Sequence, residues 1–360
     1  MSFPLEPLLM LGANRVWRTY QGGQVLDCIE GKEVPQDSHF PEDWIGSLTA
    51  AKNPGRAQAE EGISQVTRSN GESVLLTDLF STDPAYYLGE QHYGAFGLDT
   101  RILVKFLDSA IRLHFQVHPT AAFSKKFLGC TSGKTEAYVI LAIRDGIENP
   151  YIYAGFQRPP ERGQLKTWIE KQDIDSIEAC FDKIPVKTGD VFLIPGGYPH
   201  ALGEGILMVE LMEASDLAVR FEFERGGYVL PEESRFLGRD LGFALTVFDH
   251  SPVGMERFQC HPELIRQFPD GSEQRLVIGK QHTHCFSARE TIVKNKISKE
   301  ESGFYIGIVT DGCGRITVGD RSWDLHPYDR YFVAASCGVT TLESQEGLRI
   351  LECVPPDLEN

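Results

Sequence analysis

The sequence predicts a mainly β protein built from two all-β units, with a few short helices. Short runs rich in apolar and β-branched residues recur along the chain, and Gly, Asp and Pro turns separate them. Helical periodicity is rare by comparison. The length of 360 residues exceeds what one ordinary domain requires, so we expect two domains.

The first unit is predicted to contain several strands and one clear helix. At 163–181 the apolar residues follow helical spacing, which predicts a helix. It leads into the apolar run 191–194, which is short, β-prone and bounded by turn formers, so we expect a buried strand there. The other strand-like runs of this unit lie at 101–108, 111–119, 135–143 and 205–214.

A connector at 222–273, with a short helix near 232–243, separates the two units. We place the boundary near residue 255, giving domains at 1–255 and 256–360. A turn, an aspartate, an apolar strand and small residues occur in that order in both VKTGDVFLIPGG and LHPYDRYFVAAS, which suggests two versions of one barrel. The strands expected in the second unit lie at 285–295, 303–320, 321–336 and 348–356.

Composition excludes several classes of protein. The formal net charge is -16, with 51 acidic and 35 basic residues and no basic patch, so neither nucleic acid nor an acidic membrane is an expected partner. No apolar run reaches the roughly 18 residues of a membrane helix, and no basic leader precedes the first apolar stretch, so we expect a cytoplasmic protein. The eight cysteines form no CxxC pair and are expected to be reduced core residues.

Four polar side chains at predicted strand ends are candidates for a metal site. Gln116 and His118 are two residues apart in FQVHP, so a strand places both on one face. Glu136 opens the next predicted strand, and His200 follows the strand 191–194. Two imidazoles, a carboxylate and an amide oxygen can surround one divalent metal and leave room for water or substrate. With zinc and one anionic ligand, the site would keep a formal charge of about +1 and act as a Lewis acid.

The segment GDVFLIPGGYPHALGEG at 189–205 surrounds His200 with glycines and prolines, which turn the chain sharply and hold the imidazole in one place. A single histidine at a strand end is more often a hydrogen-bonded structural residue than a ligand. The joint occurrence of four candidate ligands favours the metal. The spacing G-x5-P-x-G-x2-H, from Gly189 to His200, also resembles the metal-histidine motif of cupin barrels.

Along nearly its whole length the chain resembles the class I mannose-6-phosphate isomerases (phosphomannose isomerases) of the cupin superfamily. Q-x-H-P followed by K-x-E, then P-H, then S-D-x-x-x-R is a specific combination. The segments that carry the resemblance are PEDWIGS at 41–47, LLTDLF at 75–80, YLG at 87–89, LVKFLD at 103–108, FQVHP at 115–119, GKTEAY at 133–138, VKTGDVFLIPGGYPHA at 186–201 and ELMEASDLAVR at 210–220.

The resemblance implies two cupin-type (jelly-roll) β-barrels, one Zn²⁺ per chain, and interconversion of mannose 6-phosphate and fructose 6-phosphate through an enediol. Arg220 would stabilise the enediolate charge, and Lys134 or Glu210 would move the proton; the sequence does not choose between them. The implied zinc ligands are Gln116, His118, Glu136 and His200, and the residues implied to contact substrate are Lys105, His114 and Trp17.

Two departures from the family pattern leave the exact sugar open. The family usually has L-S-x-Q before the metal histidine, whereas this chain has His114 at the place of the small hydroxyl residue. In RVWRTYQGG, the W-G-G turn of the family is stretched, so Trp17 is separated from Gly22 and Gly23. Both changes bear on residues implied to contact the substrate.

The second unit keeps its strands but lacks metal ligands, so we interpret it as a degenerate barrel that supports the first or shapes one wall of the cleft. Its counterpart of the metal motif, DRYFVAASCG, contains no histidine. His282 and His284 form an HTH pair, but no further Glu or His follows at cupin spacing. We therefore interpret these two histidines as structural.

Three alternatives to this isomerase stay open: an isomerase for a different sugar, a metal-containing sugar-binding or regulatory protein without turnover, and an iron-binding cupin oxygenase. Lys134, Glu210 and Arg220 favour an isomerase, because a binding protein needs no proton-transfer group. Gln116 argues against the oxygenase, whose sites are usually richer in histidine. The expected partner is a small sugar phosphate, and the chain is expected to be a monomer or homodimer.

Overall fold

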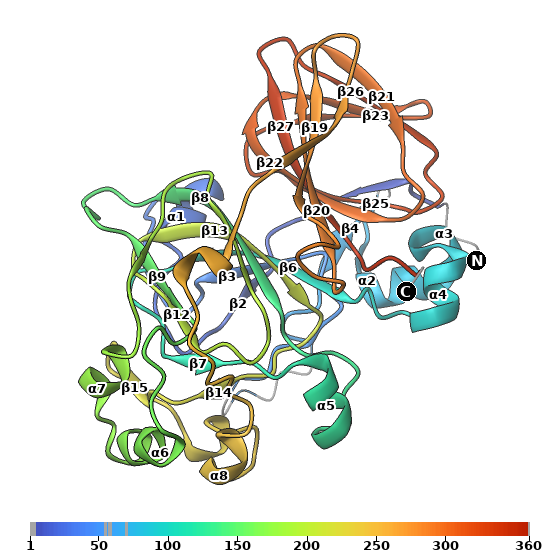
Figure 1. Cartoon of the computed structure of the whole chain (residues 1–360). Coiled ribbons are helices and arrows are strands. Elements are labelled where there is room, and N and C mark those ends of the chain that lie inside the picture. Colours follow the sequence, from blue (N-terminus) through green and yellow to red (C-terminus); the bar gives the residue numbers. More distant parts are fainter. Residues whose placement is uncertain (1–4, 54–55, 57–59, 69–70, 359–360) are drawn as a thin grey trace.

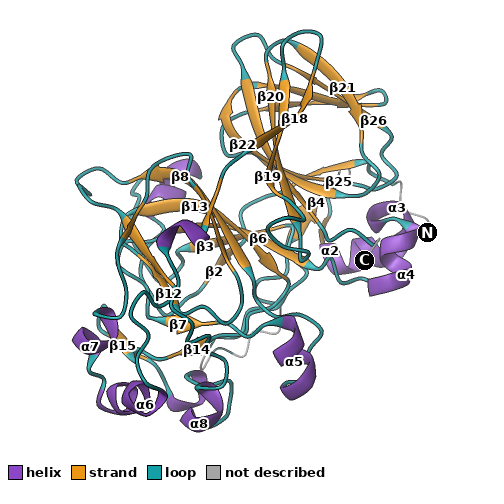
Figure 2. Ribbon diagram, viewed as in Figure 1, coloured by secondary structure: helices purple, strands orange, loops and turns teal. Residues whose placement is uncertain are grey.

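The computed structural model describes residues 5–53, 56, 60–68 and 71–358, and the mainly β fold class is confirmed. Two pairs of sheets, one formed mostly by each half of the chain, dominate the molecule (Figures 1 and 2). The helices are short, and the longest, α6 (Arg162–Lys171), has ten residues. Within the described parts of the chain, no helix is long and apolar enough to cross a membrane.

The first pair consists of a seven-stranded and a five-stranded sheet that enclose an apolar interior, to which Leu107, Ile140, Ile152 and Met208 contribute. The larger sheet has the order β17 (Gln259–Cys260), β11 (Val191–Ile194), β8 (Glu136–Ile143), β13 (Ile206–Glu213), β6 (Ile102–Asp108), β3 (Glu42–Ile45) and β2 (Arg15–Val16). The smaller sheet has the order β10 (Ile184–Pro185), β9 (Tyr151–Ala154), β12 (His200–Leu202), β7 (Gln116–Val117) and β14 (Val219–Arg220).

The second pair encloses its own interior, which includes Ile297, Ile316, Leu342 and Ile350. Strand β1, near the N-terminus, belongs to this pair because it lies against β25. The larger sheet has the order β1 (Leu8–Met10), β25 (Arg330–Val333), β22 (Tyr305–Gly312), β27 (Leu348–Val354), β20 (Ser287–Val293), β19 (Glu273–Ile278) and β18 (Glu263–Gln267). The smaller sheet has the order β21 (Lys296–Glu300), β26 (Val339–Glu343), β23 (Gly314–Val318) and β24 (Arg321–Leu325).

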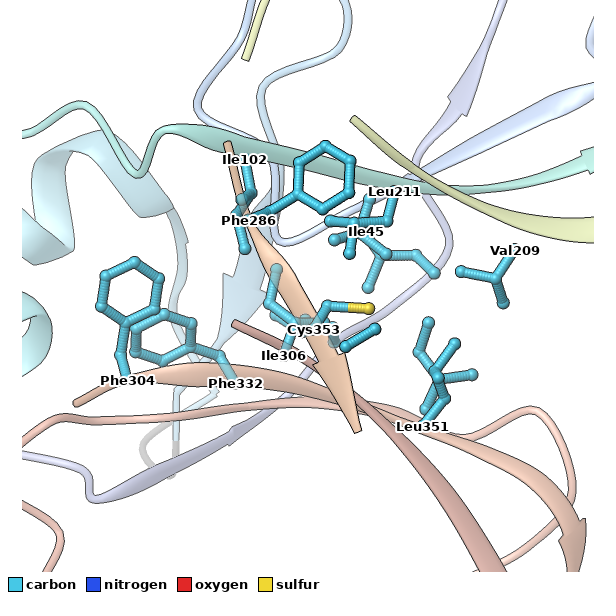
Figure 3. Packing of buried hydrophobic residues seen from close by; sticks show 14 of the residues in the cluster. Ile45, Ile102, Val209, Leu211, Phe286, Phe304, Ile306, Phe332, Leu351 and Cys353 are labelled. Carbon is cyan, nitrogen blue, oxygen red and sulfur yellow. The ribbon is translucent and has the colours of Figure 1, made fainter. Parts of the chain in front are cut away.

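The two larger sheets pack against each other through one continuous apolar core (Figure 3). Strand side chains alternate between faces, so each of these sheets turns one face to its own interior and the other to its neighbour. Ile45, Val209 and Leu211 meet Ile306 and Leu351 in this core, and all five are nearly inaccessible to solvent. The back of the first unit is therefore covered by the second.

Helices α5 to α8 lie near the smaller sheet of the first pair, whose outer face contributes to a second apolar cluster (Figure 1). Two short hairpins, β4 (Gln65–Thr67) with β5 (Ser73–Leu75) and β15 (Glu224–Arg225) with β16 (Tyr228–Val229), complete the strands. The remaining helices are α1 (Gln24–Ile29), α2 (Leu76–Thr82), α3 (Pro84–Leu88), α4 (Glu90–Phe96), α5 (Ala121–Phe127), α7 (Ile174–Glu178) and α8 (Leu241–Ala244), with 3-10 turns at Glu232–Ser234 and Met255–Arg257.

Three local expectations were wrong in detail. The single helix predicted at 163–181 is two helices, α6 and α7, because Gln172 adopts a left-handed conformation (φ 53°) and Asp173 caps the second helix. The helix expected near 232–243 is a 3-10 turn followed by the four-residue α8. The strand expected at 111–119 is regular only at Gln116–Val117.

The cysteines are free thiols, and the described residues form no disulfide. They are less buried than expected, because only Cys180, Cys260 and Cys353 lie in the core, whereas Cys28 and Cys313 are exposed.

Candidate metal centre

Three of the predicted ligands converge between the two sheets of the first pair. His118 directly follows β7, Glu136 begins β8 and His200 begins β12. Strands β7 and β12 are neighbours in the smaller sheet, whereas β8 belongs to the facing one. The ligand atoms of these three side chains lie within 4.8 Å of one another, and all three residues are buried. Among the described residues, no other group of three His, Cys, Asp or Glu side chains is so close.

Backbone carbonyls hold both imidazoles in the orientation that a metal ion requires. His118 Nδ1 donates to the carbonyl of Leu217 at 2.8 Å, and His200 Nδ1 donates to the carbonyl of Tyr198 at 3.0 Å. In each ring the hydrogen-bonded Nδ1 leaves the lone pair on Nε2, although Lys134 Nζ lies 3.2 Å from Nε2 of His118. The two Nε2 atoms lie 3.1 Å and 3.3 Å from the Glu136 carboxylate oxygens.

The donor set fits one divalent metal ion. His200 Nε2 is fully buried and makes no hydrogen bond within the described structure, which is a costly state for an isolated polar atom. Burial lowers the pKa of His118 to about 3, and the charge of Lys134 acts in the same direction, so this ring is neutral as a ligand must be. Two neutral imidazoles and one carboxylate are a common set for zinc with an open coordination position.

Gln116, the fourth predicted ligand, lies beside these three. It is opposite His200 in the β7–β12 register and shares a strand face with His118. Its side chain lines the same cavity as Glu136. The structure thus brings all four predicted ligands to one place.

Tyr138 adds a contact that the sequence reasoning missed. Its phenol donates to Glu136 Oε2 at 2.5 Å, while Lys134 Nζ lies 2.7 Å from Oε1. Burial alone would raise the pKa of Glu136, but the charge of Lys134 and the contact with His118 hold it well below its usual range. The spacing could have indicated Tyr138, because it stands two residues from Glu136 on the same strand face.

A cavity adjoins the candidate metal site. Lys105 and Glu210 face each other across β6 and β13 in its wall, with Lys105 Nζ 3.0 Å from Glu210 Oε2. Burial, aided by the charge of Glu136, raises the pKa of Glu210 to about 8 against the opposing charge of Lys105. Glu210 can therefore exchange a proton near neutral pH.

Behind Lys105 lies a buried chain of charges that the sequence reasoning did not identify. Glu42 Oε2 is 3.3 Å from Lys105 Nζ, and Glu42 Oε1 is 3.3 Å from Arg18 Nε. Arg18 also makes two hydrogen bonds to Asp216, at 2.9 and 3.0 Å. Glu42 and Asp216 lie within the quoted segments PEDWIGS and ELMEASDLAVR, but only their position in the folded chain reveals that they meet.

Arg220 also lines the cavity, and it differs from the other cations there. Among the described residues its guanidinium makes no ion pair, and its hydrogen bond to the Ser234 carbonyl is long, at 3.4 Å. Burial lowers its pKa, and the charge of Arg18 acts in the same direction. A half-buried guanidinium without a carboxylate partner is suited to bind an anion or to stabilise a negative charge that develops on a substrate.

The remaining predicted substrate contacts differ in their placement. His114 lines the cavity and is almost fully buried; its Nδ1 donates to the Glu222 carbonyl at 3.1 Å, whereas its Nε2 has no partner in the described structure. Trp17 lies outside the cavity wall, stacked on His39 with ring centroids 5.4 Å apart and edge-on to Tyr228. Thr19 and Tyr20, which follow in the same stretched turn, do line the cavity.

Comparison with known proteins links this chain to one enzyme family, although no family model matches the chain. A mannose-6-phosphate isomerase from Streptococcus mutans is 34% identical over 266 residues, which cover 72% of this chain and 78% of that protein. Sequence similarity therefore extends through most of both chains.

Solved structures share the fold. The mannose 6-phosphate isomerase from Bacillus subtilis superimposes with a TM-score of 0.73 at 21% identity, covering 96% of this chain and 99% of that one. A zinc-bound mannose 6-phosphate isomerase gives a TM-score of 0.72 at 15% identity, covering 98% and 100% of the two chains.

Proposed function

The chain belongs to the mannose-6-phosphate isomerase family, and we propose that it interconverts mannose 6-phosphate and fructose 6-phosphate with one bound zinc ion. The observation that carries the proposal is the buried convergence of His118, Glu136 and His200 beside a cavity that also holds Arg220 and the Lys105–Glu210 pair. The candidate metal ligands and the candidate groups for proton transfer thus lie at one site.

Zinc held by His118, Glu136 and His200, with Gln116 as a fourth ligand, would supply Lewis-acid stabilisation of substrate oxygens. Moving a proton between C1 and C2 of the sugar places negative charge on an enediolate oxygen. Arg220 stabilises that charge, because its guanidinium forms no ion pair with a carboxylate of the described residues.

The proton itself is moved by Glu210 or Lys134. Glu210 suits this role because burial raises its pKa to about 8, close to the pH at which the enzyme would work. Lys134 lies nearer to the metal ligands, with Nζ 3.2 Å from His118 Nε2. Lys105 holds the Glu210 side chain in place, with Nζ 3.0 Å from Glu210 Oε2.

A second candidate function is isomerisation of a different sugar. The specific observation is His114, whose buried imidazole presents an unpartnered Nε2 at the cavity wall. Because its Nδ1 donates to a carbonyl, the neutral His114 ring can only accept a hydrogen bond at Nε2, whereas a small hydroxyl residue can both donate and accept. This difference would favour a sugar that presents a hydrogen-bond donor at this position.

The first test is conversion of mannose 6-phosphate by the purified full-length protein, before and after chelation and with zinc restored. We expect activity that chelation abolishes and zinc restores. Protein that holds one equivalent of zinc but converts no mannose 6-phosphate would contradict the proposal, and conversion of another aldose phosphate would then support the second candidate.

Arg220→Ala tests the assigned chemistry. We expect turnover to fall at least about 100-fold while one zinc stays bound, because the loss of one preorganised donor to a developing oxyanion costs this much in other enzymes. Arg315→Ala, at an exposed arginine of the second unit, is the matched control and should keep full activity. Equal activity of both variants would refute the role of Arg220.

A further inference from the structure

The two pairs of sheets repeat the same strand order. In the larger sheets, β11-β8-β13-β6-β3 of the first unit corresponds to β25-β22-β27-β20-β19 of the second. In the smaller sheets, β10-β9-β12-β7 corresponds to β24-β23-β26-β21. Corresponding strands also follow one another in the same order along the chain, so a position in one unit has a definite counterpart in the other.

Strand registers identify the counterparts of the metal site. Gln116 is opposite His200 in the β7–β12 pair, and Lys299 is opposite Thr340 in the β21–β26 pair. Glu210 is opposite Lys105 on β6, as Glu352 is opposite Arg289 on β20. In the smaller sheets, His200 is opposite Ala154, the last residue of β9, as Thr340 is opposite Val318, the last residue of β23. These registers give the following equivalent positions: Gln116 with Lys299, His118 with Glu301, Glu136 with Tyr305, His200 with Thr340, Lys105 with Arg289, and Glu210 with Glu352.

At these positions the second unit contains a buried ion cluster. Lys299 Nζ lies 2.5 Å from Glu352 Oε1 and 3.1 Å from Glu301 Oε1, and the side chains of Lys299 and Glu352 have no exposed surface. The ammonium also lies 4.9 Å from the ring centroid of Tyr305. Arg289 completes the cluster through Nη1, which is 2.7 Å from Glu301 Oε2.

We propose that the Lys299 ammonium is the central cation of the second unit, at the place that corresponds to the metal site of the first. Lys299 and Arg289 bring two positive charges to the two negative charges of Glu301 and Glu352, so the buried cluster is formally neutral without any further ion. The second unit thus needs no metal to hold two carboxylates in its interior. Glu301 and Thr340 also replace both imidazoles, the preferred zinc ligands, at these positions.

Stability measurements test the role of the ammonium. We expect Lys299→Met to lower the thermal unfolding midpoint of the metal-stripped protein by about 10 °C, because it leaves the buried Glu352 and the partly buried Glu301 with one guanidinium between them. Lys296→Met, at an exposed lysine of the same strand that pairs with Glu343, is the matched control and should shift the midpoint by at most about 2 °C. An unchanged midpoint in Lys299→Met would overturn the proposal.

A charge-neutral variant separates lost charge from lost packing. In Lys299→Met combined with Glu352→Gln, the remaining charges of Arg289 and Glu301 balance each other, so we expect recovery of more than half of the lost midpoint. A double variant as unstable as Lys299→Met, or one that fails to fold when Lys299→Met folds, would show that charge balance is not the cause.

Metal content tests whether the second unit binds no metal, and this test does not depend on isomerase activity. His118→Ala combined with His200→Ala removes ligands of the first unit only, so the purified variant should retain less than one tenth of an equivalent of zinc after desalting, by elemental analysis. Retention of a full equivalent that Glu301→Gln and Glu352→Gln then remove would overturn the proposal by identifying a metal site in the second unit.

Discussion

Tyr138 orders the candidate metal site through one hydrogen bond. Its phenol donates to Glu136 Oε2, and burial together with the charge of Glu136 raises the pKa of Tyr138 well above its ordinary value. The phenol therefore stays protonated, and can donate this hydrogen bond, at neutral pH. A donor on one carboxylate oxygen restricts the rotation of Glu136, and outer-sphere groups of this kind typically change metal affinity 10- to 100-fold.

We predict that Tyr138→Phe weakens zinc binding about 10-fold and leaves the stability of the metal-stripped protein nearly unchanged, since the ring and its packing remain. Competition with a chromophoric chelator measures the affinity. Tyr153→Phe is the matched control, because Tyr153 donates to Glu178 at 2.5 Å in the same unit without contacting the ligands. If both variants bind zinc as tightly as the parent protein, Tyr138 does not position Glu136.

At the scale of elements, the turn between β11 and β12 sets the distance between His200 and His118. Gly197 N donates to the His118 carbonyl at 2.7 Å, so this turn lies directly against the end of β7. A Cβ on Gly196 would lie 2.8 Å from the Pro119 carbonyl oxygen and 2.9 Å from Thr120 Cα. Both are backbone atoms, which cannot move away as easily as the end of a flexible side chain. The absence of a side chain at Gly196 therefore permits this close approach.

We predict that Gly196→Ala separates the two histidine-bearing segments, lowers zinc affinity about 10-fold and destabilises the protein by about 1–3 kcal/mol, the usual cost of overpacking. Thermal unfolding with and without zinc measures both effects. Gly163→Ala in α6 is the control, because nothing lies within 4 Å of its added Cβ, and it should be neutral or slightly stabilising. Similar behaviour of the two variants would contradict this account of the turn.

At the scale of the whole molecule, the second unit supports the back of the strands that line the cavity. Arg330 on β25 pairs with Asp43 on β3 at 2.7 Å, and both are largely buried. Asp43 alternates along β3 with Glu42 and Trp44, which face the interior of the first unit. Arg330 also lies 5.7 Å from the ring centroid of Phe106 on the neighbouring β6. The ion pair thus fastens the second unit to β3 and β6, which carry Glu42 and Lys105.

We predict that Arg330→Met lowers the free energy of unfolding by about 3–5 kcal/mol, because it leaves the Asp43 carboxylate buried without its partner. Urea unfolding measures the loss, and the added substitution Asp43→Asn should recover part of it. Arg349→Met, which removes the more exposed pair with Glu290, should change stability by less than about 1 kcal/mol. Equal losses in Arg330→Met and Arg349→Met would refute a special role for the Arg330–Asp43 pair.

Strand alternation and local turn chemistry made much of the first unit predictable. The spacing of Gln116 and His118 placed both on one face, and the apolar run 191–194 followed by glycines and prolines indicated a strand and a turn. Local signals failed where tertiary contacts override them. Gln172 breaks the helix expected at 163–181 while its side chain bonds to the backbone of Phe221 and Phe223, a contact that no local pattern reveals.

The sequence by itself determined that the chain is mainly β, which four side chains are candidates to ligate a metal, and which family the chain resembles, because these depend on short-range periodicity and on motifs. Only the tertiary structure decided that Arg18 and Asp216, 198 residues apart, join Glu42 behind Lys105, that Trp17 lies outside the cavity wall, and that Lys299 stands where the first unit has a candidate ligand. These contacts depend on strand register and sheet packing, which are set by the burial of the whole apolar core rather than by any local segment.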